Sequence, residues 1–188
     1  MQIDRVFFPT ETLGYGKRIS IWTIGCPRRC FNCSNPELWE PDNSRDVDIH
    51  QLEKTIRGLF SMSDGITITG GDPFFQVGEL LSFLQLLRKK YNKEVLVFTG
   101  YTMEQLMVEG SDSAKCLGLI DILIDGEYID ELNDNVGLRG SSNQRIIILN
   151  KKYKDRYAQA PCWPRQSQTV LSNGKLISIG IPVISNLP

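Results

Sequence analysis

Five short apolar segments, separated by stretches with helical periodicity, constrain the fold of this chain more than any other feature. They are Arg18–Gly25, Gly65–Thr69, Glu94–Gly100, Ile120–Gly126 and Arg145–Leu149. Each segment is apolar at successive positions and most are rich in β-branched residues, which is typical of strands buried on both faces of a parallel sheet. Because strands alternate with helices along the chain, the sequence predicts an α/β fold with a parallel sheet covered by helices.

The intervening helices carry their own start signals. Asp48 with Gln51, and Thr102 with Gln105, have the spacing of a capping box. A further helix is marked by apolar residues at helical spacing, namely Val77, Leu80, Leu81, Leu84 and Leu87. Right-handed crossovers through such helices curl a parallel sheet toward a barrel. Five strands are fewer than the eight of a closed barrel, so we predict an open, partial (βα) barrel.

The C-terminal part of the chain departs from this alternation. Two β-like arms flank Asn173-Gly174 within Gln168–Pro182, which is a strong hairpin pattern. We therefore expect one domain, in which residues 1–160 form the main unit and residues 161–188 a C-terminal β-hairpin extension. Uncovered sheet edges invite aggregation, so we favour covering of an edge over partner docking as the role of the hairpin.

Composition excludes several classes of function. The chain has 188 residues, 21 Lys plus Arg against 22 Asp plus Glu, and a formal net charge of −1. Such a balance does not predict binding to nucleic acid. The N-terminal segment has no apolar core of a signal peptide, and no apolar run approaches the roughly 18 residues of a membrane span. We therefore expect a cytoplasmic protein without a membrane partner, in which clustered cysteines are metal ligands or redox groups rather than disulfides.

Three of the five cysteines, Cys26, Cys30 and Cys33, lie in the segment "GCPRRCFNC" directly after the first predicted strand. Structural zinc requires four ligands, and the single histidine, His50, begins a helix, so a Cys3His site would be strained. A cubane iron–sulfur cluster usually takes four cysteines. With three, one iron stays open to a ligand that is not protein, such as a substrate or cosubstrate.

A fourth thiolate from Cys116 or Cys162 would close the cluster and make the protein an electron carrier or give the cluster a structural role. Cys116 lies in an apolar stretch typical of a buried thiol, whereas Cys162 lies in the proline-rich connector before the hairpin. The position of the three-cysteine segment favours an open cluster. It leaves the C-terminal end of a predicted parallel strand, where ligands bind in such folds.

The turn "GGDP" leaves the matching end of the second predicted strand. Gly70 and Gly71 allow the backbone to approach a ligand closely, and amides exposed there can bind a carboxylate. Asp72 can accept hydrogen bonds from an ammonium group, so the turn offers what the charged end of an amino acid needs. Such a tetrapeptide is by itself more often a plain turn. Beside the cysteine segment, it predicts a ligand site.

The pattern CxxxCxxC after the first strand, with a GGD turn after the second, resembles the radical S-adenosylmethionine (radical SAM) superfamily. The similarity extends over roughly Thr10 to Leu149. The segments "GITITGGDP", "VFTGYTMEQL", "DILIDGEYIDELND" and "LRGSSNQRI" closely resemble the activating proteins of anaerobic ribonucleotide reductases. Arg139–Gln144, "RGSSNQ", is the most specific of these segments for that family.

The resemblance implies a [4Fe-4S] cluster held by Cys26, Cys30 and Cys33, with S-adenosylmethionine bound to the open iron. It implies an oxidoreductase that reductively cleaves S-adenosylmethionine to a 5′-deoxyadenosyl radical. That radical would then take a hydrogen atom from a glycine of a large partner, an anaerobic ribonucleotide reductase, and so install a glycyl radical there, with electrons from a donor such as a flavodoxin. Transferred by position, the residues that would face S-adenosylmethionine are Asn32, Cys33, Ser34, Gly70, Gly71, Asp72, Thr99 and Gly100.

Two positions depart from the pattern of that family. Asn32 stands before the third cysteine, where the superfamily often has an aromatic residue, and Phe31 lies one place earlier. Ser34 follows the third cysteine, where the activating proteins commonly have tyrosine. These departures do not affect the prediction of radical SAM chemistry, but they leave the identity of the partner open. The alternative prediction is a radical SAM enzyme that modifies a peptide or a small molecule.

Overall fold

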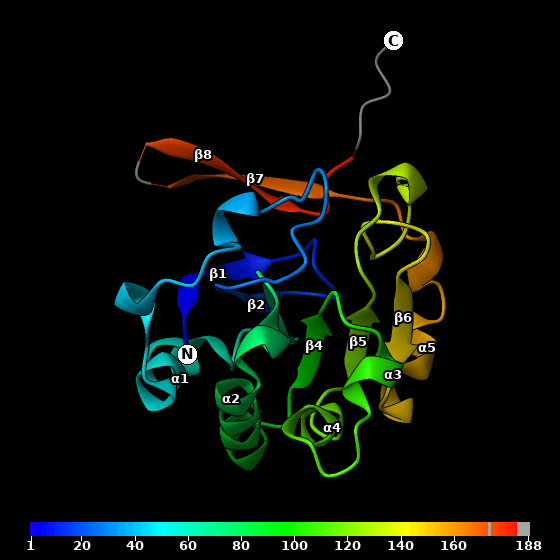
Figure 1. Cartoon of the computed structure of the whole chain (residues 1–188). Helices are drawn as coiled ribbons and strands as arrows, with labels where there is room; N and C mark the ends of the chain where they lie inside the picture. The colour runs from blue at the N-terminus through cyan, green and yellow to red at the C-terminus, as the bar shows by residue number, and fades with distance from the viewer. Residues whose placement is uncertain (173, 184–188) are drawn as a thin grey trace.

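One six-stranded sheet, in the order β1-β2-β3-β4-β5-β6, forms the centre of the computed structural model, which describes residues 1–172 and 174–183 (Figure 1). Its strands are β1 (Ile3–Thr10), β2 (Arg18–Thr23), β3 (Gly65–Gly70), β4 (Glu94–Phe98), β5 (Ile122–Asp125) and β6 (Arg145–Ile148). Strands β2 to β5 are parallel, whereas β1 and β6 run antiparallel to their neighbours. The predicted open α/β barrel is therefore confirmed, with an antiparallel strand at each edge.

The two edge strands are where the sequence-based prediction was incomplete. Strand β1 was not predicted, because Asp4, Arg5 and Pro9 interrupt its apolar pattern and most of its residues are only half-buried. The segment Arg145–Leu149 was treated as one more strand of the parallel sheet. Between β5 and β6 the chain forms no α-helix, only a loop with the short turn Asp130–Leu132. Without a helical crossover the chain returns antiparallel to β5.

Helices α1 (Ile49–Ile56), α2 (Val77–Lys90), α3 (Met103–Leu106), α4 (Asp112–Leu117) and α5 (Lys154–Tyr157) connect or flank the strands. Both predicted helix starts are present. Asp48 accepts hydrogen bonds from the amides of His50 and Gln51, and Thr102 and Gln105 form a complete capping box. The helices cover an apolar core on the strands, which buries Ile21, Ile68, Leu84 and Val97 among others. Within the described residues, no helix is long and apolar enough to cross a membrane.

The predicted hairpin is confirmed as β7 (Ser167–Ser172) and β8 (Lys175–Gly180), although Asn173 of its turn lies outside the described residues. It forms a sheet of its own and does not extend the edge of the larger sheet. Figure 1 shows it lying across the end of the barrel where the parallel strands finish. Ile179 of β8 packs there with Leu13, Trp22 and Leu38, so the hairpin covers the end of the sheet rather than its edge.

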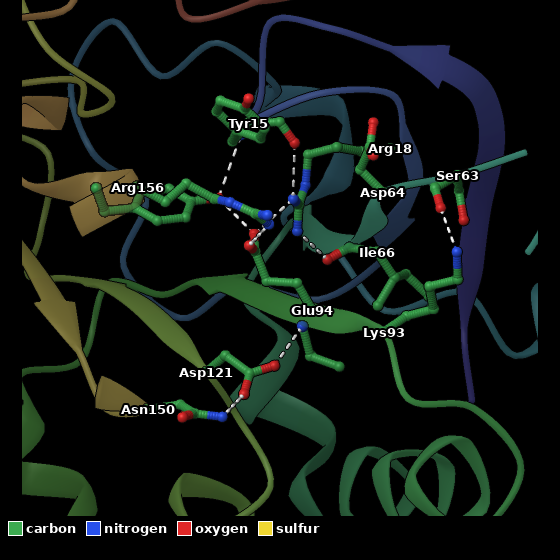
Figure 2. Close-up of polar contacts among 12 residues, drawn as sticks. Tyr15, Arg18, Ser63, Asp64, Ile66, Lys93, Glu94, Asp121, Asn150 and Arg156 are labelled. Carbon is green, nitrogen blue, oxygen red and sulfur yellow. Dashed lines mark hydrogen bonds and ion pairs between the residues drawn. The ribbon is translucent and has the colours of Figure 1, made fainter. Parts of the chain in front are cut away.

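The opposite end of the sheet is closed by a buried polar network (Figure 2). The guanidinium of Arg18 donates to the Glu94 carboxylate at 2.6 Å, to Thr67 Oγ1 at 2.6 Å and to the Ile66 carbonyl at 2.7 Å. Arg156 also donates to Glu94, at 2.8 Å. The side chains of Arg18 and Glu94 are fully buried, so the Arg18 charge depends on the Glu94 carboxylate for compensation.

We expect Glu94→Gln to lower the free energy of unfolding by about 3–5 kcal/mol, because it leaves the buried Arg18 charge without a carboxylate. Chemical denaturation of the anaerobically purified protein measures the effect. The matched control is Asp112→Asn, which breaks the solvent-exposed pair with Lys115 and should leave stability nearly unchanged. Equal stability of Glu94→Gln and the wild type would show that the pair does not hold this end of the sheet.

Candidate metal and cofactor site

A cavity of about 690 Å³ opens at the end of the sheet where the parallel strands finish. It is lined by every residue that the sequence analysis nominated: Cys26, Cys30, Asn32, Cys33, Ser34, Gly70, Gly71, Asp72, Thr99 and Gly100. These residues follow β2, β3 and β4, whose C-terminal ends meet at one edge of the sheet. The parallel arrangement therefore brings together three segments that are distant in sequence.

The cysteine loop, residues 25–39, is closed at its base by backbone hydrogen bonds. The amide of Gly25 donates to the Leu38 carbonyl at 2.8 Å, and the amide of Cys26 donates to the Trp39 carbonyl at 2.9 Å. Leu38 is 2% exposed and packs in the apolar cluster beneath the hairpin. Fixed at both ends in this way, the loop holds its three cysteines at the mouth of the cavity.

Within the loop, Arg29 and Asn32 adopt left-handed backbone conformations, with φ of 50° and 53°. Each is the residue immediately before a cysteine, and such conformations bend the chain sharply. Between the bends, the Cys33 amide donates to the Cys30 carbonyl at 3.2 Å. The Asn35 amide donates to Cys33 Sγ at 3.5 Å, the kind of hydrogen bond that tunes thiolate ligands of iron–sulfur clusters.

The chemistry of the three thiols suits a bound metal cluster. Burial raises the pKa of Cys26, and burial together with the Glu127 carboxylate raises the pKa of Cys30 to about 11. Thiolates at these positions are therefore costly unless a metal supplies positive charge. Among the described residues, no group of His, Cys, Asp and Glu side chains is arranged around a single metal ion. A cubane cluster instead distributes its thiolate ligands over separate irons, which fits three cysteines along a cavity wall.

The other candidate ligands lie elsewhere. His50 is exposed in the first turn of α1, Cys116 is fully buried in α4, and Cys162 is exposed in the connector before the hairpin. None of the three lines the cavity. The structure thus brings neither the histidine nor a fourth thiol to the cysteine loop. A Cys3His zinc site would need the histidine there, and a closed cluster would need the fourth thiol.

The GGDP turn, residues 70–73, packs directly against the start of the cysteine loop. The Gly71 amide donates to the Thr23 carbonyl at 2.8 Å, and the Asp72 amide donates to the Gly25 carbonyl at 2.8 Å. The prediction that these amides bind a ligand carboxylate is therefore wrong for Gly71 and Asp72, because both amides already bond to the backbone after β2. A Cβ on Gly71 would lie 2.5 Å from the Gly25 carbonyl oxygen, so the glycine is required by this backbone contact.

Asp72 is a structural carboxylate at the edge of the cavity. It is 1% exposed and accepts hydrogen bonds from the Phe74 amide at 3.0 Å, the Gly100 amide at 2.9 Å and the Thr99 hydroxyl at 2.9 Å. Burial raises its pKa to about 6, against the lowering effect of these bonds. Asp72 thus joins the ends of β3 and β4, and its charge contributes to the field of the cavity rather than offering a free oxygen.

Arg28 brings positive charge to the same wall. Its guanidinium lies 4.5 Å from the centre of the Tyr101 ring, donates to Gln105 at 3.1 Å and approaches the Glu127 carboxylate at 3.6 Å. Its Nε atom is buried and has no hydrogen-bond partner within the part of the chain that the structure describes. In the sequence Arg28 is only a residue between Cys26 and Cys30, whereas its contacts come from segments after β4 and β5.

The RGSSNQ segment holds the loop after β5, residues 126–133, against the cysteine loop. Gln144 donates to the Gly126 carbonyl at 2.7 Å, Asn143 donates to the Glu127 carbonyl at 2.8 Å, and the buried Ser141 hydroxyl accepts from the Ile129 amide at 3.1 Å. In turn, Cys30 Sγ lies 3.8 Å from a Glu127 carboxylate oxygen. The family-specific segment therefore acts on the cysteines indirectly, by fixing the loop that contacts them.

Several cavity residues were not nominated from the sequence. They include Arg5, Trp22, Tyr128, Asp130, Asn133, Gln144 and the hairpin residues Ser167 and Ser178. Tyr128, Asp130 and Asn133 lie in a segment that resembles the activating proteins, which was the one available signal. The hairpin carried no such signal, because nothing in its alternating pattern shows which face meets a cavity.

Comparison with known proteins agrees with this geometry. A family described as "4Fe-4S single cluster domain" matches residues 12–147. The anaerobic ribonucleoside-triphosphate reductase-activating protein of Haemophilus influenzae is 32% identical over 148 residues, which cover 74% of this chain and 94% of that protein. The pyruvate formate-lyase-activating enzyme of Staphylococcus aureus is 27% identical over 158 residues, covering 81% of this chain and 62% of that enzyme.

Among solved structures, QueE from Escherichia coli matches with a TM-score of 0.48 and 21% identity, over 65% of this chain and 68% of that chain. The family match contains the cysteine loop, the GGDP turn and the RGSSNQ segment, all of which the structure assembles around or beside one cavity. The chain therefore belongs to the 4Fe-4S single cluster domain family and, within the radical SAM superfamily, is a relative of the anaerobic ribonucleoside-triphosphate reductase-activating proteins.

Proposed function

We propose that this protein binds a [4Fe-4S] cluster and S-adenosylmethionine and installs a glycyl radical on an anaerobic ribonucleotide reductase. One observation carries the proposal: a single cavity joins the three-cysteine loop, the GGDP turn and the ends of β4 and β5. Cys26, Cys30 and Cys33 would hold the cluster. Bound there, the cluster would supply one electron to S-adenosylmethionine, which divides into methionine and a 5′-deoxyadenosyl radical.

The GGDP turn would hold the amino acid end of S-adenosylmethionine. Its Gly71 and Asp72 amides are used within the protein, so contact with the ligand would come from carbonyl oxygens of the turn. Carbonyl oxygens suit the ammonium group, and the buried Asp72 carboxylate behind them adds favourable negative charge. The positive charge of Arg28, on the same wall, suits the ligand carboxylate.

The remaining nominated residues would enclose the rest of the ligand. Asn32 and Ser34 flank the last cysteine, while Thr99 and Gly100 lie at the end of β4. Phe31 is 74% exposed, so the aromatic ring of this loop points to solvent rather than into the cavity. A volume of about 690 Å³ is within the range of roughly 300–1,000 Å³ for small-molecule sites.

The partner is proposed from the relatives. The relatives from Haemophilus influenzae, Enterobacteria phage T4 and Escherichia coli are named as activating proteins of anaerobic ribonucleoside-triphosphate reductase, and the RGSSNQ segment resembles that family in particular. A glycine is suited to carry a stable radical, because it has no side chain to crowd the flattened carbon. We place the reaction in the cytoplasm, with electrons from a small donor such as a flavodoxin.

The test is to mix reduced, cluster-loaded protein with S-adenosylmethionine and an anaerobic ribonucleotide reductase from the same source. We expect a glycyl-radical doublet on the reductase in the electron paramagnetic resonance spectrum. Variants of the reductase that lack the acceptor glycine should give no doublet. Cleavage of S-adenosylmethionine without a doublet on the reductase would contradict this target and favour a radical SAM enzyme that modifies a peptide or a small molecule.

A further inference from the structure

The C-terminal hairpin has two different faces. The register pairs Val170 with Ile177 and Leu171 with Leu176, so these two pairs point to opposite sides. The inner face, with Val170, Ile177 and Ile179, packs in the apolar cluster above β2. The outer face consists of Ser167, Thr169, Leu171, Leu176, Ser178 and Gly180.

The outer face is continuous with the wall of the cavity. At the base of the hairpin the cavity is lined by Ser167, Ser178 and Gly180 of the outer face, together with Ile179 of the inner face. From Gly180 to Leu176 the same face extends for four residues, or about 13 Å at 3.3 Å per residue. It ends in two leucines that are directly opposite each other and are 73% and 76% exposed. The two facing leucines form an exposed apolar contact of the kind that a partner molecule can cover.

The hairpin is held firmly enough to act as a binding surface. The Gln168 side chain donates to the Pro9 carbonyl at 2.9 Å, and the Thr12 hydroxyl donates to the Ile179 carbonyl at 3.1 Å. Arg165, whose side chain is 1% exposed, donates to the carbonyls of Gly140 at 2.7 Å and Pro182 at 2.9 Å. Both ends of the hairpin are therefore tied to the RGSSNQ segment.

The exposed side chains around the cavity indicate that the molecule covering the hairpin face is a protein. The side chains of Phe31, Ile129, Leu132 and Val183 are also exposed, and each is adjacent in sequence to a residue that lines the cavity. A small molecule bound inside would leave these side chains and the hairpin leucines in water. A protein that inserts a loop into the cavity would cover them. The matched family model ends at residue 147, so the hairpin lies outside the part of the chain that it matches.

We propose that the outer face of the hairpin is the docking surface for the protein substrate, with Leu171 and Leu176 as its apolar contact. The inference rests on the proposed function, since it takes the glycyl-radical reductase as the partner. The glycine loop would enter the cavity past Ser167, Ser178 and Gly180. An apolar patch of the reductase beside that loop would bury the two leucines.

Binding of full-length, cluster-loaded protein to the reductase tests the proposal by calorimetry. We expect Leu171→Asp and Leu176→Asp each to raise the dissociation constant about tenfold or more, because a buried leucine is replaced by a charge. Cleavage of S-adenosylmethionine without the reductase should be unchanged, because both leucines lie outside the cavity. The matched control is Met62→Asp, since Met62 is 59% exposed and lies just before β3, at the other end of the sheet.

The outcomes separate this inference from the proposed function. If the wild type binds and activates the reductase and the leucine variants bind it equally well, the docking surface is wrong and the function stands. If the wild type cleaves S-adenosylmethionine but neither binds nor activates the reductase, both proposals are wrong. Sedimentation of the wild type and the variants separates a third case. If the wild type is a dimer that the leucine substitutions dissociate, and reductase binding is unchanged, the outer face binds a second copy of this chain and the docking proposal is wrong.

Discussion

Replacing Cys26, Cys30 or Cys33 with alanine is expected to abolish binding of the iron–sulfur cluster. All three thiols line the cavity, and the structure brings no fourth thiol there that could replace a lost ligand. The wild type, reconstituted anaerobically, should hold about four irons and four sulfides per chain, as one cubane requires. Each variant should lose the cluster absorbance together with this iron and sulfide.

Cys116→Ala and Cys162→Ala are the matched controls for this experiment. The first thiol is buried in α4 and the second is exposed in the connector, and neither lines the cavity. Both variants should keep the iron and sulfide content of the wild type, although Cys116→Ala will lose some stability from its buried position. Stoichiometric zinc without sulfide in the wild type would instead refute the cluster.

Gly71→Val is expected to lower the rate of S-adenosylmethionine cleavage by ~10²-fold or more. The sequence suggests that a ligand approaches this glycine closely, whereas the structure gives a different reason for the glycine. A Cβ at residue 71 would lie 2.5 Å from the Gly25 carbonyl oxygen and 2.9 Å from that of Leu38, so it meets protein backbone rather than the ligand. The turn and the cysteine loop must then separate, and displacements of about 1 Å in a reactive site can cost that much.

Gly78→Val is the control for Gly71→Val, because Gly78 lies in α2 and a Cβ there would have no atom within 4 Å. It should retain S-adenosylmethionine binding and cleavage. Equilibrium binding of S-adenosylmethionine and the spectrum of the reduced cluster separate loss of the ligand site from loss of the cluster. Normal cleavage by Gly71→Val protein would show that the GGDP turn is not part of the reactive site.

Much of the fold could be predicted because local patterns and tertiary packing agree. The runs that became β2 to β5 are apolar on both faces, as a covered parallel sheet demands. The two edge strands, β1 and β6, could not be predicted correctly from such patterns. Strand β1 is only half-buried and carries charges, and the direction of β6 depends on how the chain returns after β5, which no residue of β6 encodes.

The chemistry of the site was readable in the residues themselves. The spacing of Cys26, Cys30 and Cys33 predicts a cluster, and the match of residues 12–147 to a 4Fe-4S single cluster domain agrees with it. The GGD turn adds the prediction of an amino acid ligand. The roles of individual backbone groups were not readable. Only the structure shows that the Gly71 and Asp72 amides bond to the carbonyls of Thr23 and Gly25, so these two amides are not available to a ligand.

The sequence by itself determined the kind of protein, because ligand type and spacing are local properties that a short segment carries. Tertiary structure decided which distant segments share the cavity: the loop after β5 beside Cys30, and the hairpin as a wall. The physical reason is that such contacts depend on the direction and register of strands. The alternating pattern of Gln168–Pro182 predicted two strands and a turn, whereas its packing on Trp22 decided which face joins the apolar cluster and which leucines stay exposed.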